Sequence, residues 1–176
     1  MIPLPFTTLI FQDLRGQPVR QEIKDPVVLW EAAPGTALHL GDEGPTRAGV
    51  QERVPTVEDP LVFLFTRELS RPGVTELTIG RSDECNLVVN HDSVSRVHAK
   101  LDRDPVTKRW RLTDLGSRLG TRVEGTRLVK GVPELLMDRV HIEVGEVTLR
   151  FLMPASFFAY LDKMTEHSSG GGDGDQ

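Results

Sequence analysis

Apolar and polar side chains alternate along most of the second half of the chain. A period of two places the apolar side chains on one face of a β-strand, whereas a helix cannot use this spacing. Short segments that contain Gly, Pro or Asp separate one alternating run from the next. Strands with this pattern are predicted at residues 96–104, 109–115, 140–144 and 147–151.

Shorter apolar runs predict further strands. The run at 61–66 is continuous, which is typical of a strand that is covered on both faces. Two more strands are expected at 75–79 and 87–89, and the pair Glu124-Gly125 indicates a hairpin because Gly readily supplies a positive φ. Many short antiparallel strands with no helical period between them indicate an all-β sandwich or barrel.

Residues 1–57 carry brief apolar runs that Gly and Pro interrupt repeatedly. The part at 34–55 favours a loop or linker, because Pro and Gly break β-ladders. The sequence leaves open two interpretations of this N-terminal extension. It adds a hairpin to the domain that follows, which would bury its large apolar side chains, or it is a separate tether. The strands expected here cover residues 9–11, 19–23 and 27–30, with a turn at 15–17 between the first two.

A short helix is predicted at residues 154–167, after the last strand. Pro154 is suited to the first position of a helix, and apolar side chains then recur at helical spacing. This face either packs on the sandwich or docks a partner. Residues 168–176 are rich in Gly, Ser and Asp, and we expect a disordered tail there. The apolar face consists of Phe157, Tyr160, Leu161 and Met164.

Composition narrows the possible functions. With 176 residues and 38% hydrophobic content, the chain can hold one buried core plus extensions. A net charge of -5 argues against a general affinity for nucleic acid or anionic membranes. Cys85 is the single cysteine, which favours a reducing compartment. The N-terminus resembles neither a signal peptide nor a membrane span, so we expect a cytoplasmic protein.

Three clusters of small, basic and hydroxyl-bearing residues lie where predicted strands give way to loops. They cover residues 80–82, 93–98 and 116–121. A phosphate group is bound by permanently charged guanidinium groups together with hydroxyl and backbone donors. A single Arg is usually a solvated surface charge, but three at successive loop ends of an acidic protein indicate a shared anion site. The candidate ligands are Arg81, Arg96 and Arg118, with Ser95 and Ser117.

The motifs in these clusters resemble those of forkhead-associated (FHA) domains. They are Gly80-Arg81, Ser95-x-x-His98 and Asp114-Leu115-Gly116-Ser117-x-x-Gly120-Thr121, in the order and approximate spacing of that family. The resemblance covers residues 58–153. It implies a twisted two-sheet antiparallel β-sandwich whose loops at one end recognise phosphothreonine in a partner, with no catalysis and no cofactor.

The resemblance also implies a role for each matching residue. Arg81 would contact the phosphate, and the hydroxyl of Ser95 would donate to a phosphate oxygen. Arg96 would offer its backbone amide and its guanidinium, and Arg118 occupies a position that usually reaches the ligand. Ser117 would belong to the phosphopeptide-binding residues, and it would also brace its loop. Structural support of the site falls to Gly80, His98, Gly116, Gly120 and Thr121.

One position departs from the family pattern. FHA domains place an Asn before the Gly-Thr pair, and that side chain binds the backbone of the peptide, but this chain has Leu119. The leading hypothesis is an adaptor that reads a phosphothreonine made by a Ser/Thr kinase. The alternative is an FHA-fold scaffold that binds a protein partner without phosphate.

Enzymatic and metal-binding alternatives have weak support in the sequence. A catalytic triad would have to use Ser95, His98 and Asp114, but the odd separation of Ser95 and His98 places their side chains on opposite faces of a strand. A metal site would have to use His91, Asp92 and His98, which lack a recognisable ligand spacing. We therefore expect neither a catalytic residue nor a metal ligand.

Overall fold

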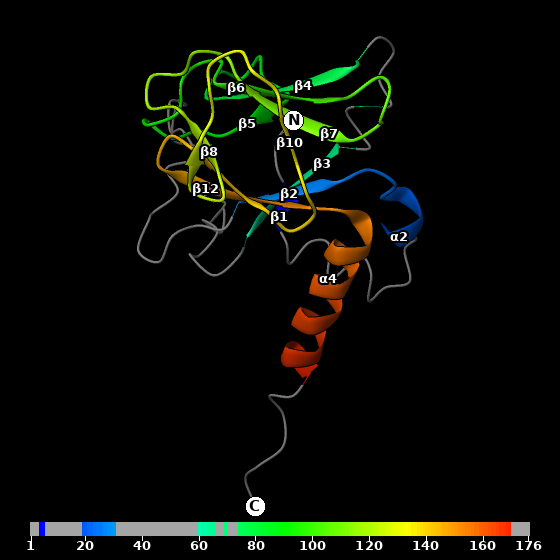
Figure 1. Cartoon of the computed structure of the whole chain (residues 1–176). Helices are drawn as coiled ribbons and strands as arrows, with labels where there is room; N and C mark the ends of the chain where they lie inside the picture. The colour runs from blue at the N-terminus through cyan, green and yellow to red at the C-terminus, as the bar shows by residue number, and fades with distance from the viewer. Residues whose placement is uncertain (1–3, 6–18, 31–59, 66–68, 70–73, 170–176) are drawn as a thin grey trace, which may run out of the picture.

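Two β-sheets and one helix are stacked in three layers (Figure 1). The computed structural model describes residues 4–5, 19–30, 60–65, 69 and 74–169. The elements, in chain order, are β1 (Leu4–Pro5), α2 (Val19–Glu22), β2 (Val27–Trp30), β3 (Leu61–Leu64), β4 (Glu76–Gly80), β5 (Leu87–Val88), β6 (Ala99–Arg103), β7 (Trp110–Asp114), β8 (Thr121–Val123), β9 (Thr126–Arg127), β10 (Glu134–Leu135), β11 (His141–Val144), β12 (Val147–Leu152) and α4 (Pro154–Ser169).

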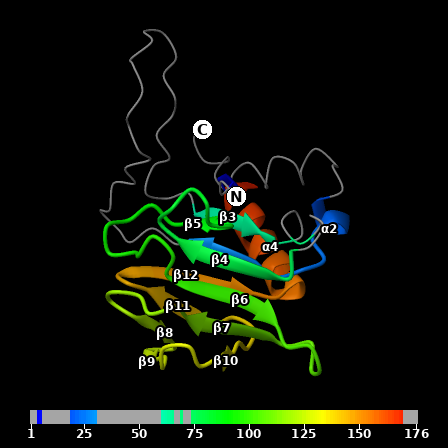
Figure 2. The ribbon, with the colours of Figure 1, turned by 90° about the horizontal axis from the view of Figure 1, so that it is seen from above.

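The strands form one sheet of seven and one sheet of five. The order in the larger sheet is β1-β3-β2-β12-β11-β8-β9, and the order in the smaller sheet is β10-β7-β6-β4-β5. Figure 2 shows the smaller sheet lying over the larger one. The strands β4 and β5 pair in parallel, while the other pairings among the described strands are antiparallel. The predicted two-sheet sandwich is confirmed, with this one parallel pair added.

The main core lies between the two sheets. The apolar residues of each alternating run point into it, as the period of two predicts. Aromatic rings occupy its centre: the ring centroids of Phe65 and Trp110 lie 5.2 Å apart, and those of Phe65 and Phe151 lie 6.3 Å apart. Burial of these large rings contributes much of the driving force for packing the sheets together.

A second apolar layer lies on the other side of the larger sheet, under α4. The strands β2 and β3 are buried on both faces, because alternate residues face the main core and the helix. This burial confirms the expectation for the continuous run at 61–66. Phe157 and Leu161 of α4 are fully buried in this layer, so the helix packs on the sandwich through them.

The N-terminal part of the chain supplies a strand within the larger sheet. The predicted strand at 27–30 is confirmed as β2, which pairs with β3 on one side and β12 on the other. The strand predicted at 19–23 is wrong, because residues 19–22 form the short helix α2. A five-residue segment with apolar ends fits one helical turn as well as a strand, so periodicity could not distinguish them. The strand expected at 9–11 and the loop at 34–55 lie outside the described residues.

The turn and helix boundaries agree closely with expectation. Glu124 and Gly125 both have positive φ, of 49° and 76°, and they join β8 to β9 as the predicted hairpin. The helix α4 begins at Pro154, as predicted, but ends at Ser169, so its last two residues fall in the segment expected to be a tail. The strand β10 was not predicted, because two exposed residues give no periodic signal.

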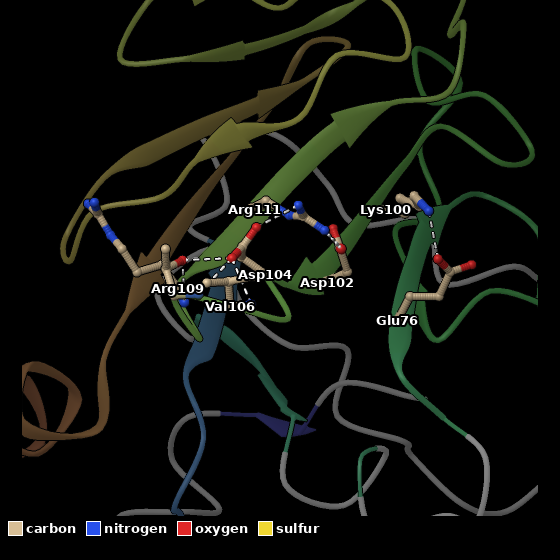
Figure 3. Close-up of polar contacts among 8 residues, drawn as sticks. Glu76, Lys100, Asp102, Asp104, Val106, Arg109 and Arg111 are labelled. Carbon is tan, nitrogen blue, oxygen red and sulfur yellow. Dashed lines mark hydrogen bonds and ion pairs between the residues drawn. The ribbon is translucent and has the colours of Figure 1, made fainter.

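Ion pairs cover the outer face of the smaller sheet. Arg111 on β7 donates to Asp102 and to Asp104, and Lys100 on β6 donates to Glu76 on β4 at 2.7 Å (Figure 3). Ion pairs that solvent still reaches, as here, add little to stability. The two cations, Arg111 and Lys100, are therefore already paired with carboxylates of the protein.

Candidate functional site

The three sequence clusters meet at one end of the smaller sheet. Ile79 near the end of β4 pairs with Ala99 at the start of β6, and Ala99 pairs in turn with Asp114 at the end of β7. The chain therefore leaves β4, enters β6 and leaves β7 at the same end of the sheet. The loops that follow or precede these three points are the segments at 81–86, 89–98 and 115–120.

Backbone hydrogen bonds join the first two clusters. The amide of Arg81 donates to the carbonyl of Ser95 at 2.9 Å, and the amide of Ser82 donates to the carbonyl of Arg96 at 3.0 Å. This close approach requires Gly80, because a Cβ there would lie 2.2 Å from the carbonyl oxygen of Arg96. The backbone thus holds Arg81 beside Ser95 independently of any ligand.

His98 joins the second cluster to the third. Its ring is fully buried, Nδ1 accepts from the Ser95 amide at 3.1 Å, and Nε2 donates to the Gly120 carbonyl at 3.2 Å. Burial lowers the pKa of His98, and the Gly120 carbonyl and the Asp114 carboxylate offset this only in part. The ring is therefore neutral near pH 7, with the proton on Nε2, and both nitrogens are engaged within the protein.

Asp114 organises the third loop. Its buried carboxylate accepts hydrogen bonds at 2.6 Å from the hydroxyls of both Ser117 and Thr121, and at 2.8 Å from the amide of Gly116. Burial opposes ionisation, but these hydrogen bonds outweigh it and lower the pKa of Asp114. The hydroxyl hydrogen of Ser117 is used here, and Gly116 and Gly120 have φ of 87° and 84°, which favours glycine.

The hydroxyl oxygen of Ser95 contacts the third cluster. Its Oγ accepts from the amide of Arg118 at 3.0 Å, and among the described residues no acceptor takes its hydroxyl hydrogen, which can therefore be donated to a ligand. The guanidinium of Arg118 donates to the carbonyl of Asp92 at 3.0 Å, which holds this long side chain across the second loop. Ser95 and Arg118 come from different clusters and lie side by side.

Arg81 and Arg96 line one open pocket of about 430 Å³. Nη1 of Arg81 lies 3.4 Å from Oδ1 of Asp92, and the two side chains are 42% and 101% exposed. Leu119, in the third loop, is 37% exposed. The remaining lining residues of the pocket are Ser82, Asp83, Val88 and Asn90.

Two residues of the second loop were not assigned a role from the sequence. Ser93 is buried, and it donates to Nδ1 of His91 at 2.8 Å while accepting from the amide of Glu146 at 2.9 Å. Gly145 is packed against it, since a Cβ there would lie 2.6 Å from the Ser93 carbonyl oxygen. Asp92 contacts both Arg81 and Arg118. No local pattern could reveal either role, because the partners are distant in sequence.

The described residues offer no metal site and no membrane-spanning helix. Within the described ranges, no group of three His, Cys, Asp or Glu side chains is arranged to hold a metal ion. Both ring nitrogens of His98 are occupied by protein partners. In the same part of the chain, no helix has the length and apolar character needed to cross a membrane.

Comparison with known proteins finds similarity over part of the chain. Residues 77–145 match the family model of the FHA domain. No curated protein matches the chain. Among solved structures, EmbR of Mycobacterium tuberculosis in complex with a low-affinity phosphopeptide is 25% identical, with a TM-score of 0.41. That match covers 46% of this chain but only 20% of the EmbR chain.

Two further solved structures are similar over about half of this chain. One comes from a study of phosphothreonine-dependent FHA domain interactions, with 25% identity, a TM-score of 0.40, and coverage of 45% of this chain and 77% of that chain. The other is the N-terminal FHA domain of Saccharomyces cerevisiae Rad53p with a phosphothreonine peptide. It is 22% identical, with a TM-score of 0.42, and the match covers 53% of this chain and 81% of that chain.

Proposed function

We propose that this chain, which contains an FHA domain, is a non-catalytic adaptor that binds phosphothreonine in a partner protein. FHA domains are binding modules that generally recognise phosphothreonine peptides in signalling. One observation carries the proposal. Arg81, the hydroxyl of Ser95, and the guanidinium groups of Arg96 and Arg118 gather at one end of the sandwich of an acidic protein.

The phosphate would be bound chiefly by Arg81 and Ser95. A phosphothreonine carries close to two negative charges at pH 7 and presents three strong acceptor oxygens. The guanidinium of Arg81 can reach two of them at once, and the Ser95 hydroxyl can donate to the third. Arg96 and Arg118 would add positive charge at the rim. None of these groups has to be deprotonated or activated to bind.

The loops that carry these donors are held in place before the ligand arrives. Backbone hydrogen bonds join the first cluster to the second, His98 joins the second to the third, and Asp114 braces the third. Ser117 belongs to this bracing set, because its hydroxyl hydrogen is directed at Asp114. A preorganised site loses less conformational entropy on binding, which raises affinity.

The same geometry disfavours catalysis by Ser95. A serine nucleophile needs a base that takes its hydroxyl proton. Nδ1 of His98 instead accepts from the backbone amide of Ser95, and the hydroxyl oxygen accepts from the amide of Arg118.

The partner protein would be a substrate of a Ser/Thr kinase. Binding of its phosphothreonine would bring the partner and this chain together.

A second candidate function is suggested by Leu119. This exposed side chain stands where the FHA pattern expects an Asn that binds the peptide backbone. Leucine can neither donate nor accept a hydrogen bond, so the peptide would be held by one such bond fewer. The second candidate is therefore a scaffold that keeps the fold and binds a protein partner without phosphate.

Titration of a phosphothreonine peptide library, followed by calorimetry on the best sequence, separates the two candidates. The adaptor should bind the phosphorylated peptide and not its unphosphorylated form. Arg81→Ala should weaken binding by roughly ten- to a hundredfold, because it removes a charge-assisted hydrogen bond. Arg109→Ala is the matched control, since Arg109 lies in the turn at the opposite end of β7.

Equal affinity for the phosphorylated and unphosphorylated peptides would overturn the adaptor and support the scaffold. An Arg81→Ala variant that binds as tightly as the natural chain would overturn the assignment of Arg81.

A further inference from the structure

We propose that the carboxylate of Asp92 is a built-in competitor of the phosphate, and that it lowers the affinity of the site for its ligand. The inference rests on the proposed function of the same site. It assigns Asp92 a role that weakens binding by competing with the ligand for Arg81.

The position of Asp92 carries the inference. Oδ1 of Asp92 lies 3.4 Å from Nη1 of Arg81, the guanidinium that would take the phosphate. The same residue accepts a hydrogen bond from Arg118 through its carbonyl oxygen at 3.0 Å. A negative charge therefore stands beside Arg81 in the ligand-free protein, on the loop that also carries Ser95.

The side chain and the main chain of Asp92 make separate contacts. The contact with Arg118 uses the carbonyl oxygen, which any residue at this position would provide. The loop is held by other bonds: the amide of Val94 donates to the carbonyl of His91 at 2.9 Å, and Ser93 is tied to Glu146. Replacing the carboxylate by an amide should thus remove the charge and leave the loop and Arg118 in place.

The contact between Asp92 and Arg81 is easily broken. The Asp92 side chain is 101% exposed, and the distance is long for an ion pair, so solvent and salt screen the attraction. When a phosphate binds Arg81, this weak attraction is lost. The repulsion between the carboxylate and a phosphate of nearly two negative charges takes its place.

Asp83 is the control that distinguishes a general effect of negative charge from direct competition for Arg81. It is exposed, it lines the same pocket as Arg81 and Arg96, and it carries the same charge as Asp92. Within the described residues, the side chain of Asp83 makes no hydrogen bond or ion pair with Arg81. A general effect of negative charge near the pocket would be shared by both aspartates, whereas direct competition for Arg81 belongs to Asp92.

The test compares Asp92→Asn and Asp83→Asn with the natural chain. Binding of a phosphothreonine peptide and of its unphosphorylated form is measured by calorimetry at low and high salt. Asp92→Asn should bind the phosphopeptide about three- to tenfold more tightly at low salt, and the gain should shrink to less than about twofold near 0.5 M salt. Asp83→Asn should gain less than half as much. Thermal unfolding without ligand should be unchanged in both variants.

The outcomes distinguish failure of the inference from failure of the adaptor function. If the natural chain binds and Asp92→Asn binds equally or more weakly, or gains no more than Asp83→Asn, competition by Asp92 is refuted while the adaptor function stands. If Asp92→Asn alone binds, the competition is stronger than expected and the inference is supported. If no protein binds any phosphopeptide, the adaptor function and the inference both fail.

Discussion

At the residue scale, the candidate site is organised by groups that would not touch the ligand. His98 and Asp114 are buried, and each makes its hydrogen bonds within the protein. The predicted ligands Arg81 and Arg118 are exposed, and main-chain bonds from their own amides anchor them to Ser95. The site therefore separates rigid support from accessible charge, which suits a binding module.

Protonation of His98 should destabilise the protein. Its pKa is lowered in the folded state, so the unfolded chain binds the proton more readily. The stability that this residue contributes is present above its unfolded pKa of about 6.5 and is lost as the pH falls toward the lower folded value.

The expected result is a fall in the free energy of unfolding as the pH drops below about 6.5, without any ligand. Denaturant titrations at several pH values measure it. His98→Gln, which has no titratable group, should show a smaller fall over the same range. If the free energy of unfolding falls equally with pH in the natural chain and in His98→Gln, His98 does not cause the pH dependence.

At the scale of single elements, β-strands with a clear period of two were predictable, and short or ambiguous elements were not. The predicted runs at 96–104, 109–115 and 140–144 contain β6, β7 and β11, and the run at 147–151 covers β12 except for its last residue, Leu152. The segment at 19–23 has too few residues to define a period, and tertiary packing beside α4 decided in favour of a helix. Arg20 of α2 contacts Asp162 of α4 there.

The helix α4 should stabilise the fold without taking part in binding. Leu161 is fully buried with Phe157 against the outer face of the larger sheet. Leu161→Ala should lower the free energy of unfolding by about 2–5 kcal/mol, because it removes buried methyl groups and leaves a cavity. The phosphopeptide affinity of the folded fraction should stay within about twofold, since the site lies on loops of the other sheet.

Chemical denaturation measures the first effect, and calorimetry below the unfolding transition measures the second. Ala159→Gly, at an exposed position of the same helix, is a control for helix propensity and should cost only about 1 kcal/mol. A large loss of affinity in Leu161→Ala would mean that the helix supports the binding loops.

At the scale of the whole molecule, the sandwich depends on a strand from far upstream. The domain expected at residues 58–153 excludes β2, which lies between β3 and β12 in the larger sheet. All four residues of β2 are buried, two against the main core and two against α4. The sequence could not show this insertion, since the pairing of β2 with β12 joins residues more than a hundred positions apart.

A fragment of residues 58–153 should therefore fail to fold cooperatively. Without β2, the strands β3 and β12 lose their common partner, and the apolar residues that β2 covers become exposed. The amide dispersion of a proton NMR spectrum and a thermal melt followed by circular dichroism measure this. The full chain is the reference. A cooperative melt of the fragment near that of the full chain would contradict the expectation.

By itself, the sequence determined the β-rich architecture, the positions of the strands with a clear period of two and the residues of the three clusters, because periodicity and turn chemistry depend on neighbours along the chain. Only the tertiary structure decided which of these residues meet. Arg81, Ser95 and Arg118 come together because antiparallel pairing brings the ends of β4, β6 and β7 to one side. The contact of Asp92 with Arg81 and the insertion of β2 arise in the same way, from contacts between segments that no local pattern connects.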